Sequence, residues 1–511
     1  MMTPTNTTPT NIKNVIVTES KEVAKIAFPV LVIYLSMIGM DLTDFFFIGR
    51  LGDSKFLAAS ALANTLFMAL ISIPYGMVHA QDTLVSQAHG ANNKFVMKSV
   101  LCRSIILCSI VCIPLLIVFI FSNSFFKLVV KEEDALVADY ASLYIHLLIP
   151  GVIPNAYFRI FSSYLVAQEE LIVPIAVGLI SLIINALLNL LLVTGINYKS
   201  LGFTGAPIAT SLSRIISLVM IVVAVWIKES RNKQKDEKSD GMTFIQKITT
   251  IIKDAVRWSG IKHYIVLAIP SVVTMCLDFC CFQIVALLSS RFGEKSLSAC
   301  NIILQITMFT YMFPFSISSA ATVLVGRNLG GGQPKRAKYL GYITIVASGL
   351  IMSISAAVVF GTRSVITYIW SDDLQVHEFV IRVAPVISLF QLFDGVQVTT
   401  SGVLRGMGRQ QISAVVGFFA YYVCGLPLGC VLAFVAHLDL VGLWVGLATA
   451  LFVLSIILFI FLIIRVNWEK ESEKAINTVK EQQEGVEEKV TNVPEITELP
   501  EMSGAEPPKV E

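Results

Sequence analysis

Charged residues are scarce in this chain of 511 residues, since Asp, Glu, Lys and Arg together make up 14% of it. Hydrophobic residue types make up 55%, and the mean hydropathy is +0.74. A soluble domain has about 25% charged residues, so the composition excludes an ordinary soluble globular protein. The net charge of +2 is too small to indicate an acidic or a basic partner.

The sequence motifs of enzymes are also missing. The chain contains no glycine-rich phosphate-binding loop, no cluster of His, Cys and carboxylate residues at metal-ligand spacing, and no Ser-His-Asp context for a nucleophile. The run Gly330-Gly331-Gly332 precedes Pro334 and is interpreted as the turn that ends a helix. We therefore expect a protein that is not an enzyme, has no resident cofactor or metal, and does not bind nucleic acid.

Long apolar runs are the dominant feature that is present. A helix that crosses a membrane needs about 20 mostly apolar residues, and only helices and closed barrels satisfy the backbone in lipid. Runs of this length recur through the chain and predict an all-α integral membrane protein with twelve transmembrane helices. The expected spans are 25–48, 56–79, 97–121, 136–158, 170–193, 205–228, 263–289, 297–322, 338–361, 377–401, 412–436 and 441–465.

Composition divides the chain into five expected parts. They are a tail over 1–23, a six-helix lobe over 24–228, a charged linker over 229–262, a second six-helix lobe over 263–465, and an acidic tail over 466–511. Within the linker, Phe244 to Trp258 alternates apolar and basic residues at helical spacing, which predicts an amphipathic helix at the membrane surface. The acidic tail cannot bury a core and is predicted to be disordered.

Lys and Arg concentrate before the first span, in the connections 2-3, 6-7, 8-9 and 10-11, and after the last span. The positive-inside rule then predicts that both termini are cytoplasmic. A plasma membrane and a vacuolar or endosomal membrane are both compatible with this multi-pass topology.

The two halves of the chain repeat each other. The segment Ile73 to Asn93 aligns without gaps on Phe313 to Gln333, with Pro74 on Pro314 and Gly90 on Gly330. Six spans per half give both halves the same direction, so the repeat is parallel, about an axis along the membrane normal. Transporters use such pairs of lobes to rock around a site near the middle of the membrane, and a channel or a membrane enzyme rarely needs them.

Two carboxylates lie inside expected spans of the second half. Asp394 interrupts the tenth span and Asp278 the seventh. A charge at this depth costs about 3 kcal/mol or more, and such residues normally face a bundle interior or a water-filled path. We interpret both as functional sites for a proton or a cation. Helical spacing puts Gln391, Gln397 and Ser401 on the face of Asp394, where they line a cavity or form a hydrogen-bonded seam between helices.

Acids in the first span are further candidates. Asp41 and Asp44 lie three residues apart on one helical face, which suits a carrier of protons or sodium. The alternative is neutralisation by an intramembrane arginine such as Arg214. In the fifth span, Asn185 and Asn189 complete the same pocket or merely connect helices.

Other polar residues receive smaller roles. Gln283 and Gln305 are uncharged, so they bind a substrate or a neighbouring helix but carry no proton. Together with Tyr311 and Gln391 they are candidate cavity-lining residues. Asp82 is interpreted as structural. The histidines, His79 among them, are expected near the ends of spans, in headgroup-level or capping positions.

These features together resemble the multidrug and toxic compound extrusion (MATE) family, and its eukaryotic branch in particular. The resemblance covers nearly all of residues 24–470. It rests on AQDTLVSQAHGA in the first half, and in the second half on YMFPFSISSAATVLVGRNLGGG, TTSGVLRGMGRQQ, YYVCGLPLG, GLWVG and RVNW, in this order. The resemblance implies two six-helix lobes and export of organic cations and other amphiphiles in exchange for protons or sodium.

The resemblance also implies roles for individual residues. Asp278 and Asp394 stand where the family has essential Glu residues, and Asp44 matches the acid that bacterial members use for cation coupling. The chain departs from the family pattern at three kinds of position. Asn189 stands where some prokaryotic members have Asp, Gln283 and Gln305 stand where the animal branch tends to have Glu, and both acids of the second lobe are one methylene shorter.

The sequence therefore predicts a proton-coupled antiporter that exports amphipathic, often cationic, small molecules by alternating access. Its expected partners are these small molecules, protons or sodium, and the lipid bilayer. A sodium-coupled antiporter that uses Asp44 is one alternative. A lipid-linked precursor flippase of the same broad superfamily is another, although such proteins usually have more spans and a basic cavity, whereas the buried charges here are expected to be mainly acidic. A receptor or scaffold is disfavoured by the paired acids and the repeat.

Overall fold

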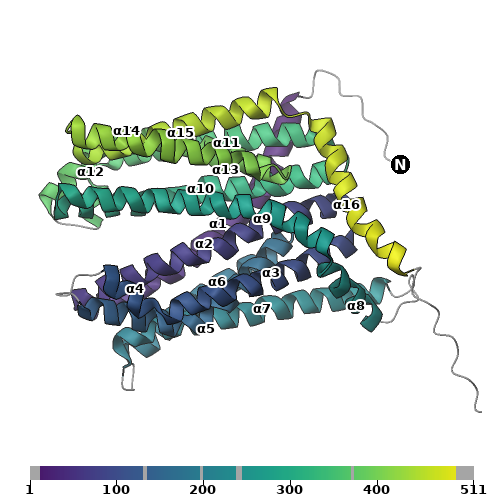
Figure 1. Cartoon of the computed structure of the whole chain (residues 1–511), viewed down its shortest axis with the longest axis horizontal. Helices are drawn as coiled ribbons and strands as arrows, with labels where there is room; N and C mark the ends of the chain where they lie inside the picture. Colours follow the sequence, from purple (N-terminus) through teal and green to yellow (C-terminus); the bar gives the residue numbers. More distant parts are fainter. Residues whose placement is uncertain (1–11, 130–134, 196–199, 237–243, 370–372, 491–511) are drawn as a thin grey trace, which may run out of the picture.

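The computed structural model describes residues 12–129, 135–195, 200–236, 244–369 and 373–490, and the regular structure in these ranges is helical throughout (Figure 1). The helices are α1 Ile12–Gly49, α2 Ser54–Gly90, α3 Lys94–Ile120, α4 Ser122–Val129, α5 Ala135–Val166, α6 Ile172–Asn189, α7 Gly205–Asp236, α8 Phe244–Ala255, α9 Trp258–Ser289, α10 Glu294–Gly330, α11 Pro334–Thr362, α12 Leu374–Gly406, α13 Gln410–Phe418, α14 Leu426–Cys430, α15 Asp439–Ile464 and α16 Trp468–Val490.

Twelve helical segments of the described chain are long and apolar enough to cross a membrane, which confirms the predicted number. Eleven of them are single α-helices or close to it. The crossing over Gln410–Val435 is composite, because π-helical turns at Phe419–Gly425 and Val431–Val435 interrupt α13 and α14. The helices extend beyond the expected spans, and α1 begins as early as Ile12.

The crossings form two groups, α1–α7 and α9–α15. In Figure 1, α2–α7 lie in the lower layer and α10–α15 in the upper layer, and the start of α1 reaches up to the upper layer. The corresponding helices α2 and α10 both have 37 residues. Pro74 lies 90 − 74 = 16 residues before the last residue of α2, and Pro314 lies 330 − 314 = 16 residues before the last residue of α10. This correspondence agrees with the parallel repeat seen in the sequence.

The two groups touch most closely where α2 and α10 end. A Cβ atom at Gly90 would lie 1.9 Å from the carbonyl oxygen of Arg327, and one at Gly330 would lie 2.1 Å from that of Gln87. Only glycine allows two backbones to approach this closely. The Gln87 side chain also donates to the carbonyl of Gly406, at 3.0 Å. We call this end of the bundle the closed end.

Ion pairs reinforce the closed end. Arg327 of α10 pairs with Glu22 of α1 and with Glu169, which follows α5. Arg336 of α11 pairs with Glu19 at 2.9 Å and with Glu22 at 2.5 Å. Because these side chains are only partly exposed and form a network, they contribute more than an isolated surface pair would.

Contacts at the opposite end hold each group together separately. In the first group, the Phe56 and Phe203 rings stack at 4.9 Å. In the second group, Phe292 stacks on Phe434 at 4.9 Å, and Lys295 pairs with Asp373 at 3.1 Å. The contacts between the groups are thus concentrated at the closed end and at mid-depth.

A helix forms in the linker, and it is tied to the first group. Asp254 of α8 pairs with Arg103 of α3 at 3.3 Å and accepts a hydrogen bond from Ser99. Asp254 and Arg103 are both buried. Removing either partner would leave an uncompensated buried charge, so this pair fixes α8 against α3.

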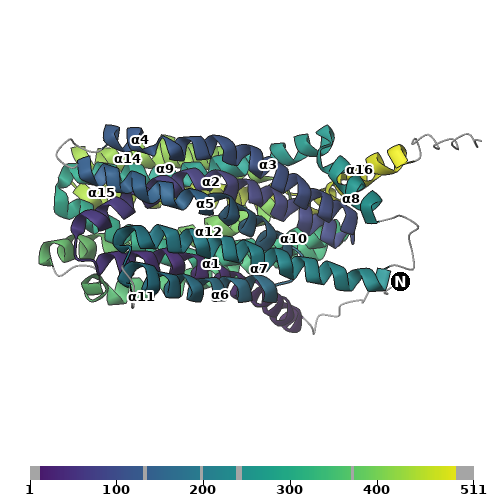
Figure 2. The ribbon, with the colours of Figure 1, turned by 90° about the horizontal axis from the view of Figure 1, so that it is seen from below.

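The prediction of disorder after residue 465 is wrong for residues 468–490, which form α16. Figures 1 and 2 both place α16 beside α8 at the same end of the bundle, and α16 runs across it. Trp468, Ala475 and Val479 are buried on one face of this helix. The acidic average composition concealed this short amphipathic pattern. Residues 491–511 of the predicted tail lie outside the described residues.

Candidate functional site

Asp44 of α1 lies at the centre of a buried polar cluster in the first group. The Thr210 hydroxyl donates to its Oδ2, and the Asn189 amide donates to its Oδ1 at 2.7 Å. Asn185 and the Tyr144 hydroxyl approach the same carboxylate at 3.4 Å. The structure therefore brings the predicted residues Asp44, Asn185 and Asn189 together, from α1 and α6.

The amides of this cluster have unused acceptors. Asn185 and Asn189 are four residues apart on α6, so they face α1 together, and a π-helical turn begins directly after Asn189. Both amide Oδ1 atoms are buried without a hydrogen-bond partner among the described residues. A buried acceptor normally has a partner, so these two oxygens are unsatisfied in this conformation.

Asp41 does not share this cluster. Its carboxylate lies 3.8 Å from Arg214 of α7, whose guanidinium also stacks over the Phe67 ring at 4.5 Å. The alternative of neutralisation by an intramembrane arginine therefore applies to Asp41, and Asp44 has neutral donors instead.

A cavity lies between the second group and α2. Asp278 of α9 and Tyr311 of α10 line it, as both were expected to. The Tyr311 ring stacks on Phe315 with centroids 5.3 Å apart. The other lining residues are His79, Ser271, Thr274, Met275, Gln397, Val398, Ser401, Arg405, Gln410 and Ser413. An acid, aromatic faces and several neutral polar groups thus meet in one concave site, as in many small-molecule sites.

Asp394 is buried in α12 and is not among the residues that line this cavity. No described side chain donates a hydrogen bond to it, yet it is close enough to Asp278 for the two charges to interact. Tyr311 and Tyr421 lie within electrostatic range of both carboxylates. The two acids therefore belong to one electrostatic unit, of which only Asp278 is exposed to the cavity.

Three of the four candidate glutamines do not line the cavity. Gln391 is fully buried and donates to Thr310 at 3.2 Å. This hydrogen bond joins α12 to α10, which was the alternative role given for this residue. Gln283 is half-buried, and Gln305 is exposed. Gln397 does line the cavity, where its amide lies 3.4 Å from Ser401.

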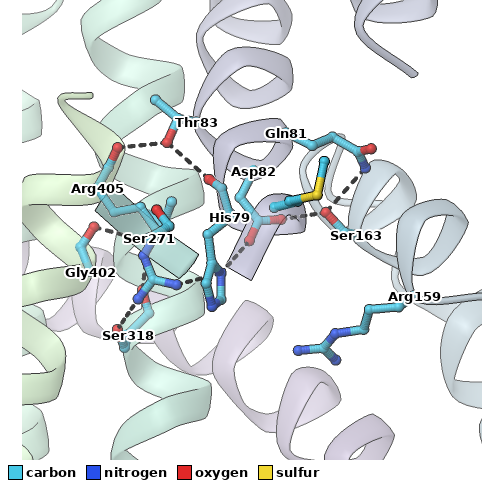
Figure 3. Close-up of polar contacts among 12 residues, drawn as sticks. His79, Gln81, Asp82, Thr83, Arg159, Ser163, Ser271, Ser318, Gly402 and Arg405 are labelled. Atoms are coloured by element: carbon cyan, nitrogen blue, oxygen red, sulfur yellow. Dashed lines mark hydrogen bonds and ion pairs between the residues drawn. The ribbon is translucent and has the colours of Figure 1, made fainter. Parts of the chain in front are cut away.

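A polar network at the boundary between the groups was not predicted as a site (Figure 3). Arg405 of α12 contacts His79 of α2 at 2.5 Å and Ser318 at 3.2 Å. Asp82 accepts a hydrogen bond from Ser163. The expectation that the histidines lie near span ends is wrong for His79, which is buried in the middle part of α2.

Arginine contributes part of the buried charge, which was expected to be mainly acidic. Arg103, Arg159 and Arg214 are all buried. Arg159 donates to the Tyr34 hydroxyl at 2.9 Å and lies over the Tyr34 ring at 4.4 Å. The high cost of a charge inside a membrane span identified Asp394, and it applies equally to a cation. The same argument could therefore have identified Arg159 and Arg405 as candidate functional residues.

Comparison with known proteins agrees with this architecture. The family model described as MatE matches residues 29–191 and 270–431, one segment in each half of the chain. The chain is 28% identical over 459 residues to "Multidrug and toxin extrusion protein 1" of Danio rerio, covering 90% of this chain and 74% of that protein. It is 29% identical to "Protein DETOXIFICATION 14" of Arabidopsis thaliana, covering 91% and 92%.

Solved structures extend the similarity to three dimensions. The eukaryotic MATE transporter AtDTX14 superposes with a TM-score of 0.81 at 27% identity, over 91% of this chain and 99% of that chain. A MOP superfamily transporter from Pyrococcus furiosus has a TM-score of 0.76 at 17% identity, over 90% and 97%, which supports the fold alone. With two matched segments that together span most of both groups, the chain belongs to the MatE family of membrane transporters, the multidrug and toxin extrusion proteins.

Proposed function

We propose that this transporter is a secondary antiporter that exports amphipathic, often cationic, small molecules in exchange for protons. The observation that supports this most is the pair Asp278 and Asp394, two acids of the second group that interact across a distance and have no arginine or lysine paired with them among the described residues. The printed names of the relatives, multidrug and toxin extrusion and DETOXIFICATION, agree with such a substrate class.

Coupling follows from competition for the two carboxylates. An ionised Asp278 attracts a cation into the cavity, where the Tyr311 and Phe315 rings cover its apolar body. A proton taken up by the acid pair removes that attraction and releases the cation. Since proton and substrate use the same charges, each lowers the affinity for the other, as linkage requires.

Alternating access requires that the two groups of helices act as lobes, with boundaries near 24–228 and 263–465. The closed end carries the Lys- and Arg-rich connections, so the positive-inside rule places it in the cytoplasm together with both termini. A conformation that is tied at the cytoplasmic end leaves the opposite end free to release substrate outward. The membrane of residence is a plasma membrane or a vacuolar or endosomal membrane.

Transport in proteoliposomes tests this proposal. With an inward proton gradient and a fluorescent organic cation, Asp278→Asn and Asp394→Asn should each reduce proton-driven exchange to the level of empty vesicles. The matched control is Asp139→Asn, because Asp139 forms only an exposed pair with Lys127. Full proton-driven transport by either Asp278→Asn or Asp394→Asn would refute the assignment.

Sodium coupling through Asp44 is the second candidate, and the unpartnered Oδ1 atoms of Asn185 and Asn189 favour it. Carboxylate and amide oxygens are suitable ligands for a hard cation. A sodium gradient imposed at constant pH distinguishes the two candidates. Sodium-driven transport that Asp44→Asn abolishes and Asp394→Asn retains would support sodium coupling over the proton mechanism.

A lipid-linked precursor flippase of the same broad superfamily is the third candidate. The buried arginines remove part of the charge argument against it, but the twelve candidate spans remain fewer than such proteins usually have. Export of a soluble organic cation by purified protein in vesicles that contain no lipid-linked substrate would exclude a dedicated flippase.

A further inference from the structure

His79 contacts two groups of opposite character through one ring nitrogen. Its Nδ1 lies 2.5 Å from Arg405 Nη1 and 3.2 Å from Asp82 Oδ2 (Figure 3). A guanidinium can only donate hydrogen bonds, and an ionised carboxylate can only accept them. The nitrogen must therefore accept from Arg405 without a proton of its own, or carry a proton and donate to Asp82. It cannot satisfy both partners at once.

The two partners belong to different groups of helices. His79 and Asp82 lie on α2, whereas Arg405 lies on α12. The protonation state of Nδ1 therefore decides whether the hydrogen bond between His79 and Arg405 joins the two groups. Thr83, one turn further along α2, also donates to the backbone carbonyl of Arg405 at 2.7 Å, so the contact lies within the interface that leads to the closed end.

Asp82 is held in place from its own side of the interface. Its Oδ1 accepts from the Ser163 hydroxyl of α5, and Gln81 donates to Ser163 at 3.2 Å and to the carbonyl of Ile160 at 2.8 Å. These bonds leave Oδ2 directed at His79. A protonated His79 therefore finds a fixed acceptor, Asp82, in the first group. An unprotonated His79 finds its donor, Arg405, in the second group.

Charged and titratable groups from several neighbouring helices lie near His79. Arg405 of α12 and Arg159 of α5 are the cations, and Asp82 of α2 is the only carboxylate among the groups that interact strongly with the imidazole. Phenols approach this network from three further helices, namely Tyr34 of α1, Tyr264 of α9 and Tyr311 of α10. An imidazolium beside Arg405 would place two positively charged donors next to each other. Protonation of His79 and loss of its contact with Arg405 must therefore occur together.

We propose that His79 is a proton-controlled latch between the two lobes. The neutral ring accepts from Arg405 and ties the lobes, whereas the ring protonated at Nδ1 donates to Asp82 and releases Arg405. His79 lines the same cavity as Asp278, so a proton that enters from the open side reaches both. The latch rests on the proposed alternating access of the lobes, and it adds a positioning residue in the interface to the acids that bind substrate.

The latch predicts that acid moves the lobes. Release of Arg405 removes the hydrogen bond between His79 and Arg405, which joins the lobes at mid-depth beside the contacts of the closed end. The opposite end then becomes free to close. Lys55 and Glu294 are exposed at the starts of α2 and α10, at the end of the bundle opposite Gly90 and Gly330. The distance between spin labels at these two positions should shorten as the pH is lowered from about 8 to about 4, a window that includes the range in which histidine ordinarily titrates and extends to its acid side.

The experiment measures this distance by double electron-electron resonance on the full chain in lipid nanodiscs, with labels attached through unnatural amino acids because the chain has 9 cysteines. His79→Gln is the diagnostic variant. Its amide accepts from Arg405 with the oxygen and donates to Asp82 with the nitrogen at the same time, and it does not titrate. The pH-dependent shift in distance should fall to less than about half that of the unaltered chain.

The control is His146→Gln, the same substitution at an exposed histidine that contacts only the carbonyl of Ile120. It should keep the full shift. Asp82→Asn is a second variant that acts on the other partner. It removes the negative charge that stabilises the protonated ring and should move the midpoint of the shift to lower pH. Size-exclusion profiles and melting temperatures show that each variant is folded.

The outcomes separate the latch from the proposed function. A full shift in His79→Gln would overturn the latch, as would an unchanged midpoint in Asp82→Asn or the absence of any pH-dependent shift in the unaltered chain. Asp394→Asn should abolish substrate exchange and retain the part of the shift that depends on His79. If proton-driven transport is absent from the unaltered chain but the His79-dependent shift is present, the proposed function fails and the latch stands.

Discussion

The hydroxyl of Thr210 donates a hydrogen bond to the carboxylate of Asp44, which joins the last helix of the first lobe to its first helix. Neither residue is exposed to solvent. The bond is the only one from a hydroxyl of α7 to this acid among the described residues. It connects the acid at the centre of the cluster to a helix that precedes the linker.

Replacing Thr210 with valine keeps the shape of the side chain and removes the donor. A buried hydrogen bond to a charged group is worth about 1.5–3 kcal/mol, so Thr210→Val should lower the free energy of unfolding by about that amount. Thr210→Ser keeps the hydroxyl and should retain most of the stability. Thermal unfolding of the purified variants measures both effects. Equal melting temperatures for the valine and serine variants would show that the bond contributes nothing.

A substitution at the closed end should shift the balance between conformations. In Gly90→Ala, the added methyl group would overlap the carbonyl of Arg327, and overpacking of this kind typically costs about 1–3 kcal/mol. The cost applies only while the lobes are tied, so the variant should favour conformations in which the Gly90 and Gly330 backbones have separated. The distance between labels at Lys55 and Glu294 should become shorter at neutral pH.

The control for this substitution is Gly361→Ala in α11, where an added Cβ would meet nothing within 4 Å. It should leave the distance distribution unchanged. A distribution for Gly90→Ala that matches the control would mean that the closed end can absorb a methyl group without opening.

The sequence was sufficient to predict the features that depend on one helix at a time. Apolar length identified the twelve crossings, and spacing of four identified Asn185 and Asn189 as one face of α6. The period of a helix does not reveal which neighbour covers that face. For this reason Gln391 was a candidate for the cavity and is instead buried against Thr310.

Contacts between distant segments account for the features that the sequence did not predict. His79 and Arg405 are 326 residues apart, and nothing in the local pattern of either indicates the other. The helix α16 was missed because its acidic composition resembles a disordered tail, whereas its stability depends on partners in other helices. Glu471, for example, is buried because Arg409 lies beside it.

Acid should weaken the start of α12. Asp373 caps this helix by accepting from the backbone N–H of Gln375, and this bond together with Lys295 holds the pKa of Asp373 below its ordinary value. A carboxyl whose pKa is lower in the folded state stabilises the fold above its unfolded pKa, and the effect is lost as the pH falls through the folded value. Asp373→Ala should therefore reduce the melting temperature at neutral pH, and this reduction should become smaller as the pH falls below about 4, the ordinary pKa of an aspartate.

Asparagine is the matched control at this position, because it caps helices about as well as aspartate but carries no charge. The melting temperature of Asp373→Asn at neutral pH should lie between those of the unaltered chain and Asp373→Ala. A difference between Asp373→Ala and the unaltered chain that persists undiminished in acid would exclude the carboxylate as its cause.

The C-terminal helix α16 should restrain both lobes. Ser472 donates to the carbonyl of Leu329 at 2.8 Å, and Glu471 pairs with Arg409. The two partners, Leu329 and Arg409, belong to the second lobe. Further along the same helix, Val479 packs among residues of the first lobe such as Val96 and Met97. One element therefore contacts both lobes at the closed end, where the proposed alternating access requires the lobes to separate.

Glu471→Gln tests this restraint with a single substitution. It removes the charge that pairs with Arg409 and keeps the shape, so the cost should be about 1–3 kcal/mol, the range for an impaired buried partner. Weakened attachment of α16 should lower the melting temperature and increase the rate of substrate exchange, because the closed end opens more readily. Glu473→Gln, an exposed acid two positions away, is the control and should change neither quantity. Exchange that slows in Glu471→Gln while the fold is retained would instead show that α16 supports the transport cycle and does not restrain it.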